Sequence, residues 1–302
     1  MRTVTTVAEL RSLLDDERRN HHTVGLVPTM GYLHAGHLSL MEAAARDCDV
    51  VVTSIFVNPL QFAPGEDLEN YPRDPEGDAR KAEGAGTPVL FTPAEAEMFP
   101  AGRAAVATTV EVAGLSDAME GASRRTHFGG VCTIVAKLFN IVGESRAYFG
   151  EKDYQQLAIV RRMAGELSFP VEVIGCPIVR EPDGLAMSSR NVYLTPDERA
   201  EAPVLRRALL AGAAAIRDGE TDAEQLRTMM GSMIDAAPYA RLDYVEVADA
   251  ATLQPQEVAG PTSRLFGAVR FGRARLIDNV GVDAPADAVP RPGAVDPPGG
   301  AG

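Results

Sequence analysis

The residues with the clearest chemical potential are two histidines that follow an apolar run. His34 and His37 close the segment Pro28-Thr29-Met30-Gly31-Tyr32-Leu33-His34-Ala35-Gly36-His37, and the run 24–27 before it has strand character. Apolar residues after the segment recur at helical spacing, so we expect a helix to start near His34. Such a helix would direct unpaired N–H groups and the positive end of its dipole at an anion. Both imidazoles would then lie on one helix face, and Gly36 would let a ligand approach closely. The segment therefore predicts a phosphate-binding turn.

The alternative is that both imidazoles only cap the turn and form local hydrogen bonds. Lone histidines are commonly structural, whereas histidines with perturbed pKa values gather at functional sites. Three further polar clusters favour a site, because each is predicted at the carboxyl end of a strand, where open α/β sheets bind ligands. These clusters are Ser54–Phe62 at the end of strand 50–57, Phe149–Leu157 at the end of a third strand with Lys152 and Asp153 at a helix start, and Gly184–Asn191 after strand 171–179.

The histidine segment resembles the HIGH-type signature of the nucleotidyltransferase superfamily. Together, the four segments resemble the pantoate–β-alanine ligase (pantothenate synthetase) family, whose motifs occur in the same order from about Val24 to Asn191. Weaker agreement continues at 243–246 and 275–279. The resemblance implies that pantoate and ATP form pantoyl adenylate and pyrophosphate, after which the amine of β-alanine displaces AMP to give pantothenate. It also implies a homodimer. ATP chemistry implies Mg²⁺, which binds mainly through phosphate oxygens and water with few protein ligands, so no metal-binding motif is expected in the sequence.

By the same resemblance, His37, His34 and Lys152 are the catalytic candidates. The alternative for Lys152 is a surface lysine in a helical ion pair. Asp153 is expected to bind the ribose hydroxyls, to cap a helix, or both. The full ATP-binding set that the resemblance implies is Met30, Gly31, His34, Gly36, His37, Gly150, Lys152, Asp153, Val179, Met187, Ser188, Ser189 and Arg190.

The acid-binding end is expected to use neutral groups. Gln61 and Gln156 match amides that bind pantoate in the family, and an amide can pair with hydroxyls as well as with a carboxylate. The alternatives are a loop-tip position for Gln61 and a helix-surface position for Gln156. Met30 and Phe62 would either face the gem-dimethyl group or belong to the core. The predicted set for pantoate and β-alanine is Gln61, Gln156, Met30, Asn58 and Phe62.

The segment Arg124–Gly130 also matches the family and leads into a predicted helix. We place it at the margin of the site, because a basic turn before a helix is often only solvated. The roles of Arg124 and His127 stay open.

Composition limits the classes of partner. The chain has 302 residues, 45% of them hydrophobic, and a formal net charge of −13. Its overall field would repel a nucleic-acid backbone, so no nucleic-acid partner is expected. No apolar run is long enough to span a bilayer, and residues 1–6 lack the apolar core of a signal peptide. We therefore expect a cytoplasmic protein without membrane contact.

No chemistry is predicted for the cysteines or for His21 and His22. Cys48, Cys132 and Cys176 are odd in number and far apart, which favours buried packing over a disulfide framework or a zinc site. His21 and His22 are adjacent, and a solvated turn is favoured over a metal-binding pair.

The predicted fold is α/β, with a Rossmann-like parallel sheet in a domain at 1–179, an α+β cap domain at 180–282 and a disordered tail at 283–302. Absence of Gly-x-Gly-x-x-Gly after the first strand argues against a nicotinamide cofactor. Predicted helices are 7–19, 35–46, 129–142, 153–167, 196–217 and 221–236, and predicted strands are 24–28, 49–57, 89–91, 147–149, 171–179, 243–248, 264–271 and 274–279.

Two competing functions remain at this level. One is another enzyme of the superfamily, such as a nucleotidyltransferase that builds a dinucleotide cofactor or a fragment of an aminoacyl-tRNA synthetase. Gln61 and Gln156 favour a small hydroxy acid instead, and the acidic charge disfavours tRNA. The other is a catalytically silent nucleotide-binding regulator, which the joint presence of His34, His37, Lys152, Ser188, Ser189 and Arg190 disfavours.

Overall fold

The computed structural model describes residues 1–63 and 68–284. These residues form two compact units. The first contains 1–179 together with 187–189 and 251–254, and the second contains 180–186, 190–250 and the described residues from 255 onward. Nearly all of the predicted tail at 283–302 lies outside the described residues.

Within the described part of the first unit, one parallel sheet has the strand order β1-β4-β3-β2-β5-β6. This confirms the predicted α/β class with a Rossmann-like parallel sheet. The central strand Val24–Thr29 is buried almost throughout, as expected for a parallel strand that is covered on both faces. The strands are β1 (Arg2–Val4), β2 (Val24–Thr29), β3 (Val50–Ile55), β4 (Val89–Phe91), β5 (Ser145–Gly150) and β6 (Val171–Cys176).

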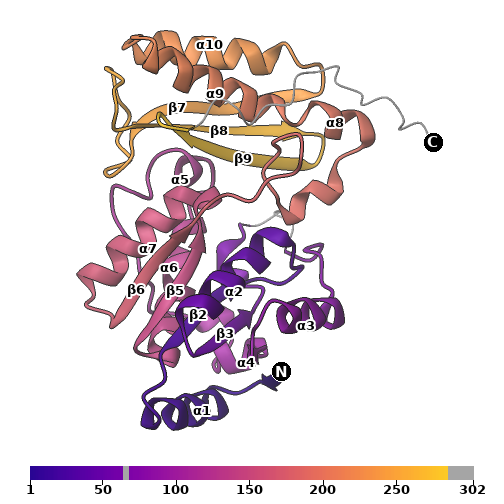
Figure 1. Cartoon of the computed structure of the whole chain (residues 1–302), viewed down its shortest axis with the longest axis vertical. Coiled ribbons are helices and arrows are strands. Elements are labelled where there is room, and N and C mark those ends of the chain that lie inside the picture. The colour runs from indigo at the N-terminus through magenta and orange to yellow at the C-terminus, as the bar shows by residue number, and fades with distance from the viewer. Residues whose placement is uncertain (64–67, 285–302) are drawn as a thin grey trace, which may run out of the picture. The chain divides into compact units, whose positions relative to one another are not determined.

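Helices cover both faces of this sheet (Figure 1). Helix α2 packs against β2, β3 and β5, whereas α6 contacts β2, α1 and α7. Helix α6 is apolar because its side chains fill the space between the sheet and these neighbouring helices. The helices of the first unit are α1 (Val7–Arg19), α2 (Ala35–Asp47), α3 (Pro75–Gly84), α4 (Glu95–Met98), α5 (Glu120–Ser123), α6 (His127–Val142) and α7 (Tyr154–Glu166).

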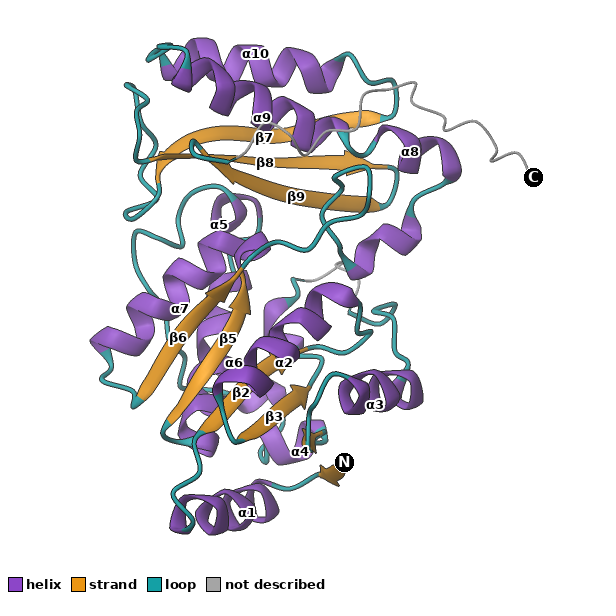
Figure 2. Cartoon of the chain, viewed as in Figure 1, coloured by secondary structure: helices purple, strands orange, loops and turns teal. Residues whose placement is uncertain are grey.

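The second unit has an antiparallel sheet of order β7-β8-β9, with helices packed against it (Figure 2). Its core joins leucines of α9 to apolar residues of α10 and of all three strands. The elements are α8 (Pro196–Glu201), α9 (Val204–Arg217), α10 (Ala223–Asp235), β7 (Ala240–Asp249), β8 (Ser263–Phe271) and β9 (Ala274–Gly281).

Several predicted boundaries were wrong. The predicted helix 196–217 is two helices, α8 and α9, with Pro203 at the N-cap of α9; a proline has no N–H to continue the preceding helix. The strand predicted at 171–179 ends at Cys176, before Pro177. The predicted connection between β3 and β4 contains α3, and the sequence prediction also missed β1, α4 and α5.

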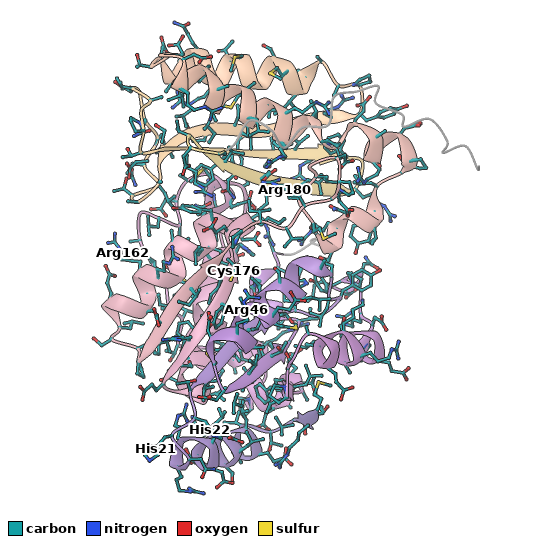
Figure 3. All side chains as sticks on the ribbon, viewed as in Figure 1. His21, His22, Arg46, Arg162, Cys176 and Arg180 are labelled. Atoms are coloured by element: carbon teal, nitrogen blue, oxygen red, sulfur yellow. The ribbon has the colours of Figure 1, made fainter. Side chains whose placement is uncertain are left out.

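Figure 3 shows His21 and His22 beside α1, and Cys176 at the end of β6. Both histidines are exposed, and His22 Nδ1 lies 2.7 Å from Glu17 Oε2. The described residues contain no group of three or more His, Cys, Asp or Glu side chains that could hold a metal ion. Cys132 and Cys176 are buried, whereas Cys48 is half-buried, and all three are free thiols. None of the described helices is both long and apolar enough to cross a membrane.

Candidate functional site

The predicted polar segments leave one edge of the parallel sheet. Thr29 at the end of β2 pairs with Ile55 at the end of β3, and Gly150 at the end of β5 pairs with Cys176 at the end of β6. Because all these strands are parallel, their carboxyl ends lie at the same edge. Segments 28–37, 58–62 and 150–156 therefore start from that edge, as the sequence predicted.

The histidine segment forms the start of α2. His34 is the N-cap residue and Ala35 begins the helix, which confirms the predicted start. The ring centroids of His34 and His37 are 4.0 Å apart, so the two imidazoles do share one helix face. A Cβ on Gly36 would lie 2.9 Å from His34 Cε1 and 3.9 Å from Met187 Cβ. Glycine is therefore needed for the His34 ring to fold over the first turn, and this turn lies beside Met187.

Both rings cap the helix through one nitrogen. His34 Nδ1 accepts a hydrogen bond from the backbone N–H of Gly36 at 3.2 Å, and His37 Nδ1 accepts one from the backbone N–H of His34 at 3.3 Å. A backbone N–H can only donate, so each Nδ1 is unprotonated and each neutral ring carries its proton on Nε2. The capping alternative is therefore correct for Nδ1, while Nε2–H of each ring remains a donor that capping does not use.

Both histidines are uncharged at neutral pH. Burial, followed by the positive charge of Lys152, lowers the pKa of His34 to about 4. Burial, followed by the neighbouring His34, lowers the pKa of His37 to about 3. Asp153 opposes both shifts, which places the Lys152 and Asp153 charges near the rings. The pair therefore offers two neutral N–H donors rather than two imidazolium ions.

Lys152 and Asp153 lie in the short 3-10 helix Glu151–Asp153, directly before α7. Lys152 Nζ is 3.4 Å from Asp153 Oδ1, and the Lys152 side chain is 21% exposed, so it is not a freely solvated lysine. Asp153 occupies the N-cap position of α7, but its side chain forms no capping hydrogen bond. Its carboxylate thus remains directed to other partners. Gly150 has an ordinary φ of −76°, so its backbone conformation does not require glycine.

Gln61 has an orientation that the surrounding backbone imposes. Asn58 Oδ1 accepts from the N–H of Leu60, and therefore Asn58 Nδ2 is the atom that donates to the carbonyl of Gly130 and to Gln61 Oε1, at 3.1 and 2.9 Å. Because Gln61 Oε1 is the acceptor, its Nε2 is left to donate elsewhere. Among the described residues, Gln61 Nε2 has no hydrogen-bond partner. The site thus contains an amide donor of fixed direction, and Asn58 is what fixes it.

The Arg124–Gly130 segment holds the backbone of Gln61. Arg124 Nη2 and His127 Nδ1 lie 3.1 and 3.0 Å from the Gln61 carbonyl oxygen, to which both donate. A Cβ on Gly130 would lie 2.1 Å from the Leu60 carbonyl oxygen, so only glycine permits this close approach. The roles of Arg124 and His127 were open from the sequence alone, and the structure places both against the residue predicted to bind pantoate.

The two neighbouring glutamines at the start of α7 have different surroundings. Gln155 is buried, and its amide donates to the carbonyls of Leu115 and Ala118 and accepts from the N–H of Glu120. Gln156, the predicted ligand, is half-buried, and its side chain makes no hydrogen bond with the described residues. Consecutive helical residues point about 100° apart, so one amide supports the loop 115–120 while the other is available.

The remaining predicted residues are placed as follows. Met187 donates its backbone N–H to the Val179 carbonyl at 3.0 Å, and this bond holds the 187–189 segment against the connection that follows β6. Ser189 is buried and Ser188 half-buried, whereas Arg190 belongs to the second unit. Met30 is half-buried, and the half-buried Phe62 packs its ring 6.0 Å from that of Tyr71.

Comparisons with known proteins give a consistent result. Residues 2–281 match the family model described as pantoate-beta-alanine ligase. The chain is 51% identical to a pantothenate synthetase of Heliobacterium modesticaldum over 94% of this chain and 100% of that protein. A crystal structure of pantothenate synthetase from Thermus thermophilus has a TM-score of 0.87 at 52% identity, covering 93% of this chain and 99% of that one.

A second solved structure carries information on ligands. It is a pantoate-beta-alanine ligase from Francisella tularensis, described as complexed with beta-gamma ATP and beta-alanine. It has a TM-score of 0.77 at 31% identity and covers 95% of this chain and 99% of that one.

Proposed function

Because the chain belongs to the pantoate–β-alanine ligase family, we propose that the site at the carboxyl ends of the parallel strands joins pantoate to β-alanine and converts ATP to AMP and pyrophosphate. The observation that carries the assignment of residues is the pair of uncharged histidines at the N-terminus of α2, whose capping bonds use Nδ1 and leave Nε2–H as a donor. Family membership favours this ligase over the other nucleotidyltransferases considered from the sequence, and over a silent regulator.

In the first step, a carboxylate oxygen of pantoate attacks the α-phosphorus of ATP. A P–O bond forms, the bond to the β-phosphate oxygen breaks, and pyrophosphate leaves with that electron pair. His34 and His37 donate Nε2–H to phosphate oxygens, and the Lys152 ammonium balances the charge that accumulates there. Donors already aimed at such charge lower the barrier without reorganising. Met30, Gly31, Gly36, Gly150, Asp153, Val179, Met187, Ser188 and Ser189 complete the proposed ATP site within the first unit.

Pantoate binds at the amide end of the site. Gln61 Nε2, which Asn58 leaves free by pairing with Gln61 Oε1, donates to an oxygen of pantoate, and Gln156 supplies a second amide. A neutral amide binds a carboxylate less strongly than a cation would. The attacking carboxylate oxygen therefore keeps its nucleophilicity. Met30 and Phe62 provide apolar contacts for the two methyl groups.

In the second step, the uncharged amine of β-alanine attacks the acyl carbon of pantoyl adenylate. The C–N bond forms, the acyl C–O bond to AMP breaks, and the nitrogen releases a proton. We assign no covalent intermediate on the protein. Burial raises the pKa of the Cys176 thiol and raises that of Cys132 to about 12, so neither is an activated nucleophile. The reaction therefore relies on positioning and on electrostatic stabilisation.

Mg²⁺ is proposed to enter as part of the ATP substrate, bound by phosphate oxygens and water. The groups proposed to contact the phosphates are mainly N–H donors and the Lys152 ammonium rather than a cluster of carboxylates. Such groups suit phosphate oxygens that already carry Mg²⁺ better than direct coordination of the metal by the protein. We also propose a homodimer, following the resemblance to the family, and keep the sequence-based expectation of a cytoplasmic location as a proposal.

Isotope exchange tests this function directly. Labelled pyrophosphate should exchange into ATP when pantoate and Mg²⁺ are present and β-alanine is absent, and addition of β-alanine should then release AMP and pantothenate. Production of pantothenate without exchange would argue against a free adenylate step. Exchange that does not depend on pantoate would contradict the proposed substrate.

The proposed acid end is tested by Gln61→Glu, which keeps the shape of the side chain and replaces the outward donor with a carboxylate oxygen. We expect the KM for pantoate to rise about 100-fold, because two like charges would then face each other, while calorimetric ATP binding stays within about threefold. His37→Asn serves as the matched variant at the nucleotide end, where turnover should fall instead. If Gln61→Glu abolishes ATP binding and leaves the KM for pantoate unchanged, the two ends have been assigned the wrong way round.

A further inference from the structure

The loop before α2 has a backbone that its own sequence does not explain. Gly31 and Tyr32 are consecutive residues with φ values of +84° and +51°. A left-handed conformation is ordinary for Gly31, but for a residue with a Cβ it is uncommon and unfavourable, so surrounding contacts must hold Tyr32 there. This loop determines where His34 enters α2.

Those contacts come from α3, more than forty residues further along the chain. Asp78 is 2% exposed, and its Oδ2 and Oδ1 accept the backbone N–H groups of Tyr32 and Leu33 at 2.8 and 2.7 Å. Lys81, one turn later on α3, donates from Nζ to the Leu33 carbonyl at 2.9 Å. Together, two side chains of one helix thus bind three backbone groups of two consecutive loop residues.

The fit between loop and helix is close. A Cβ on Gly31 would lie 3.0 Å from Asp78 Oδ2 and 3.0 Å from Ile55 Cγ2, so the loop has no room to move toward either. Helix α3 is itself fixed at its start, where Asp74 caps the N–H of Gly77 at 3.0 Å and Pro75 occupies the first turn. The helix therefore forms a firm support for the loop.

We propose that Asp78 and Lys81 are positioning residues for adenylation, which hold the 31–34 loop so that His34 and the first turn of α2 face the triphosphate. This inference rests on the proposed function of His34 and His37. The proposed positioning role differs from a general role in stability. Within the described residues, every hydrogen bond of the Asp78 and Lys81 side chains is made to a backbone group of Tyr32 or Leu33, directly before His34. Neither residue needs to touch a substrate.

The polarity of the Asp78 carboxylate matches its two partners. Both oxygens face N–H donors, so an aspartate satisfies both, whereas an asparagine side chain at this position would present its own NH₂ to one of them. The change Asp78→Asn keeps the volume of the side chain and replaces one hydrogen bond by a repulsive contact between two N–H donors. Lys81→Met removes the third bond and keeps most of the apolar stem.

Hydrogen–deuterium exchange and steady-state kinetics together test the proposal. Asp78→Asn, Lys81→Met and the control Arg80→Met would be compared on the full chain; Arg80 lies between the two on α3 with a side chain 73% exposed. We expect exchange in a peptide spanning 31–36 to accelerate at least tenfold in Asp78→Asn and less in Lys81→Met. The kcat of pyrophosphate exchange should fall at least tenfold in Asp78→Asn, while the KM for pantoate stays within threefold of the wild-type value. The control should match the wild-type protein in both measurements.

Two results would overturn the proposal. One is a loop that exchanges faster in the variants while kcat is unchanged, which would show that the loop geometry does not matter for the chemistry. The other is a lower kcat with unchanged exchange in 31–36, which would show that Asp78 acts in another way. If Asp78→Asn fails to fold, Lys81→Met is judged by the same two criteria. Failure of the proposed function would be recognised separately, because the wild-type chain itself would then show no pantoate-dependent exchange.

Discussion

The two nitrogens of His37 can be separated by substitution, because they have different partners. Asparagine places an oxygen where the imidazole has Nδ1, so His37→Asn can still accept the N–H of His34 but has no group at the position of Nε2. Glutamine places its NH₂ near the position of Nε2, so His37→Gln retains an outward donor but loses the acceptor. The pair of variants therefore distinguishes a capping role from a catalytic one.

The expected magnitudes follow from the two hydrogen bonds. Loss of one local cap typically lowers the free energy of unfolding by about 1 kcal/mol, which we expect for His37→Gln and not for His37→Asn. Loss of one donor aimed at developing charge typically lowers the rate by about 10²–10³, which we expect for His37→Asn, with a smaller loss for His37→Gln. Urea denaturation and single-turnover adenylation at saturating ATP would measure the two effects.

The opposite pattern would refute these assignments. If His37→Asn is as stable as the wild-type chain and turns over within threefold of it, the outward Nε2–H is not used in adenylation. If His37→Gln is fully stable, the hydrogen bond from His34 N–H to His37 Nδ1 contributes nothing to the folded state. Unchanged ATP binding in both variants would locate the rate effect in the chemical step.

Further outcomes are expected from the same features. The free energy of unfolding should fall as the pH drops from about 6.5 toward 4. Folded His34 and His37 have pKa values of about 4 and 3 and stay neutral over this range, whereas the same histidines in the unfolded chain bind protons. His37→Asn removes one such group, so its urea midpoint should fall less steeply over that range; an equal slope would contradict the assigned neutrality. Replacement of Cys48, Cys132 and Cys176 together by alanine should leave kcat within a few-fold once folding is verified by circular dichroism, and a folded but inactive triple variant would contradict a packing role.

The sequence was most informative where local chemistry decides the structure. The strand-to-helix turn at 24–37 was predicted with its helix start, because an apolar run, a glycine and a helical repeat specify such a turn almost alone. The parallel sheet followed from alternating strands and helices. These features depend on neighbours along the chain, which a single sequence displays directly.

Helix α3 was not predicted, although its residues support the candidate site. Its sequence Pro75-Glu76-Gly77-Asp78-Ala79-Arg80-Lys81-Ala82-Glu83-Gly84 has few apolar residues and contains glycine, so periodicity gives almost no signal. The pair Asp74-Pro75 was the available sign, because aspartate at the N-cap and proline at the first helical position mark a helix start. That Asp78 binds the 31–34 loop could not be derived, since the contact joins residues more than forty positions apart.

The same separation explains why the orientation of Gln61 had to come from the structure. Its identity was a sequence prediction, but its donor direction depends on Asn58, whose own orientation depends on the Gly130 carbonyl at the start of α6. At both ends of the site, a backbone group determines which side-chain atom accepts a hydrogen bond from the protein. The N–H groups of His34 and Gly36 donate to the imidazole Nδ1 atoms. At the other end, Asn58, held by backbone groups, donates to Gln61 Oε1. What remains at both ends of the candidate site is a neutral N–H donor whose polarity does not change with pH near neutrality. Substitutions that leave the side chains intact but shift these backbone groups, such as Gly130→Ala against the Leu60 carbonyl, should therefore impair pantoate binding as strongly as changes to the glutamine itself.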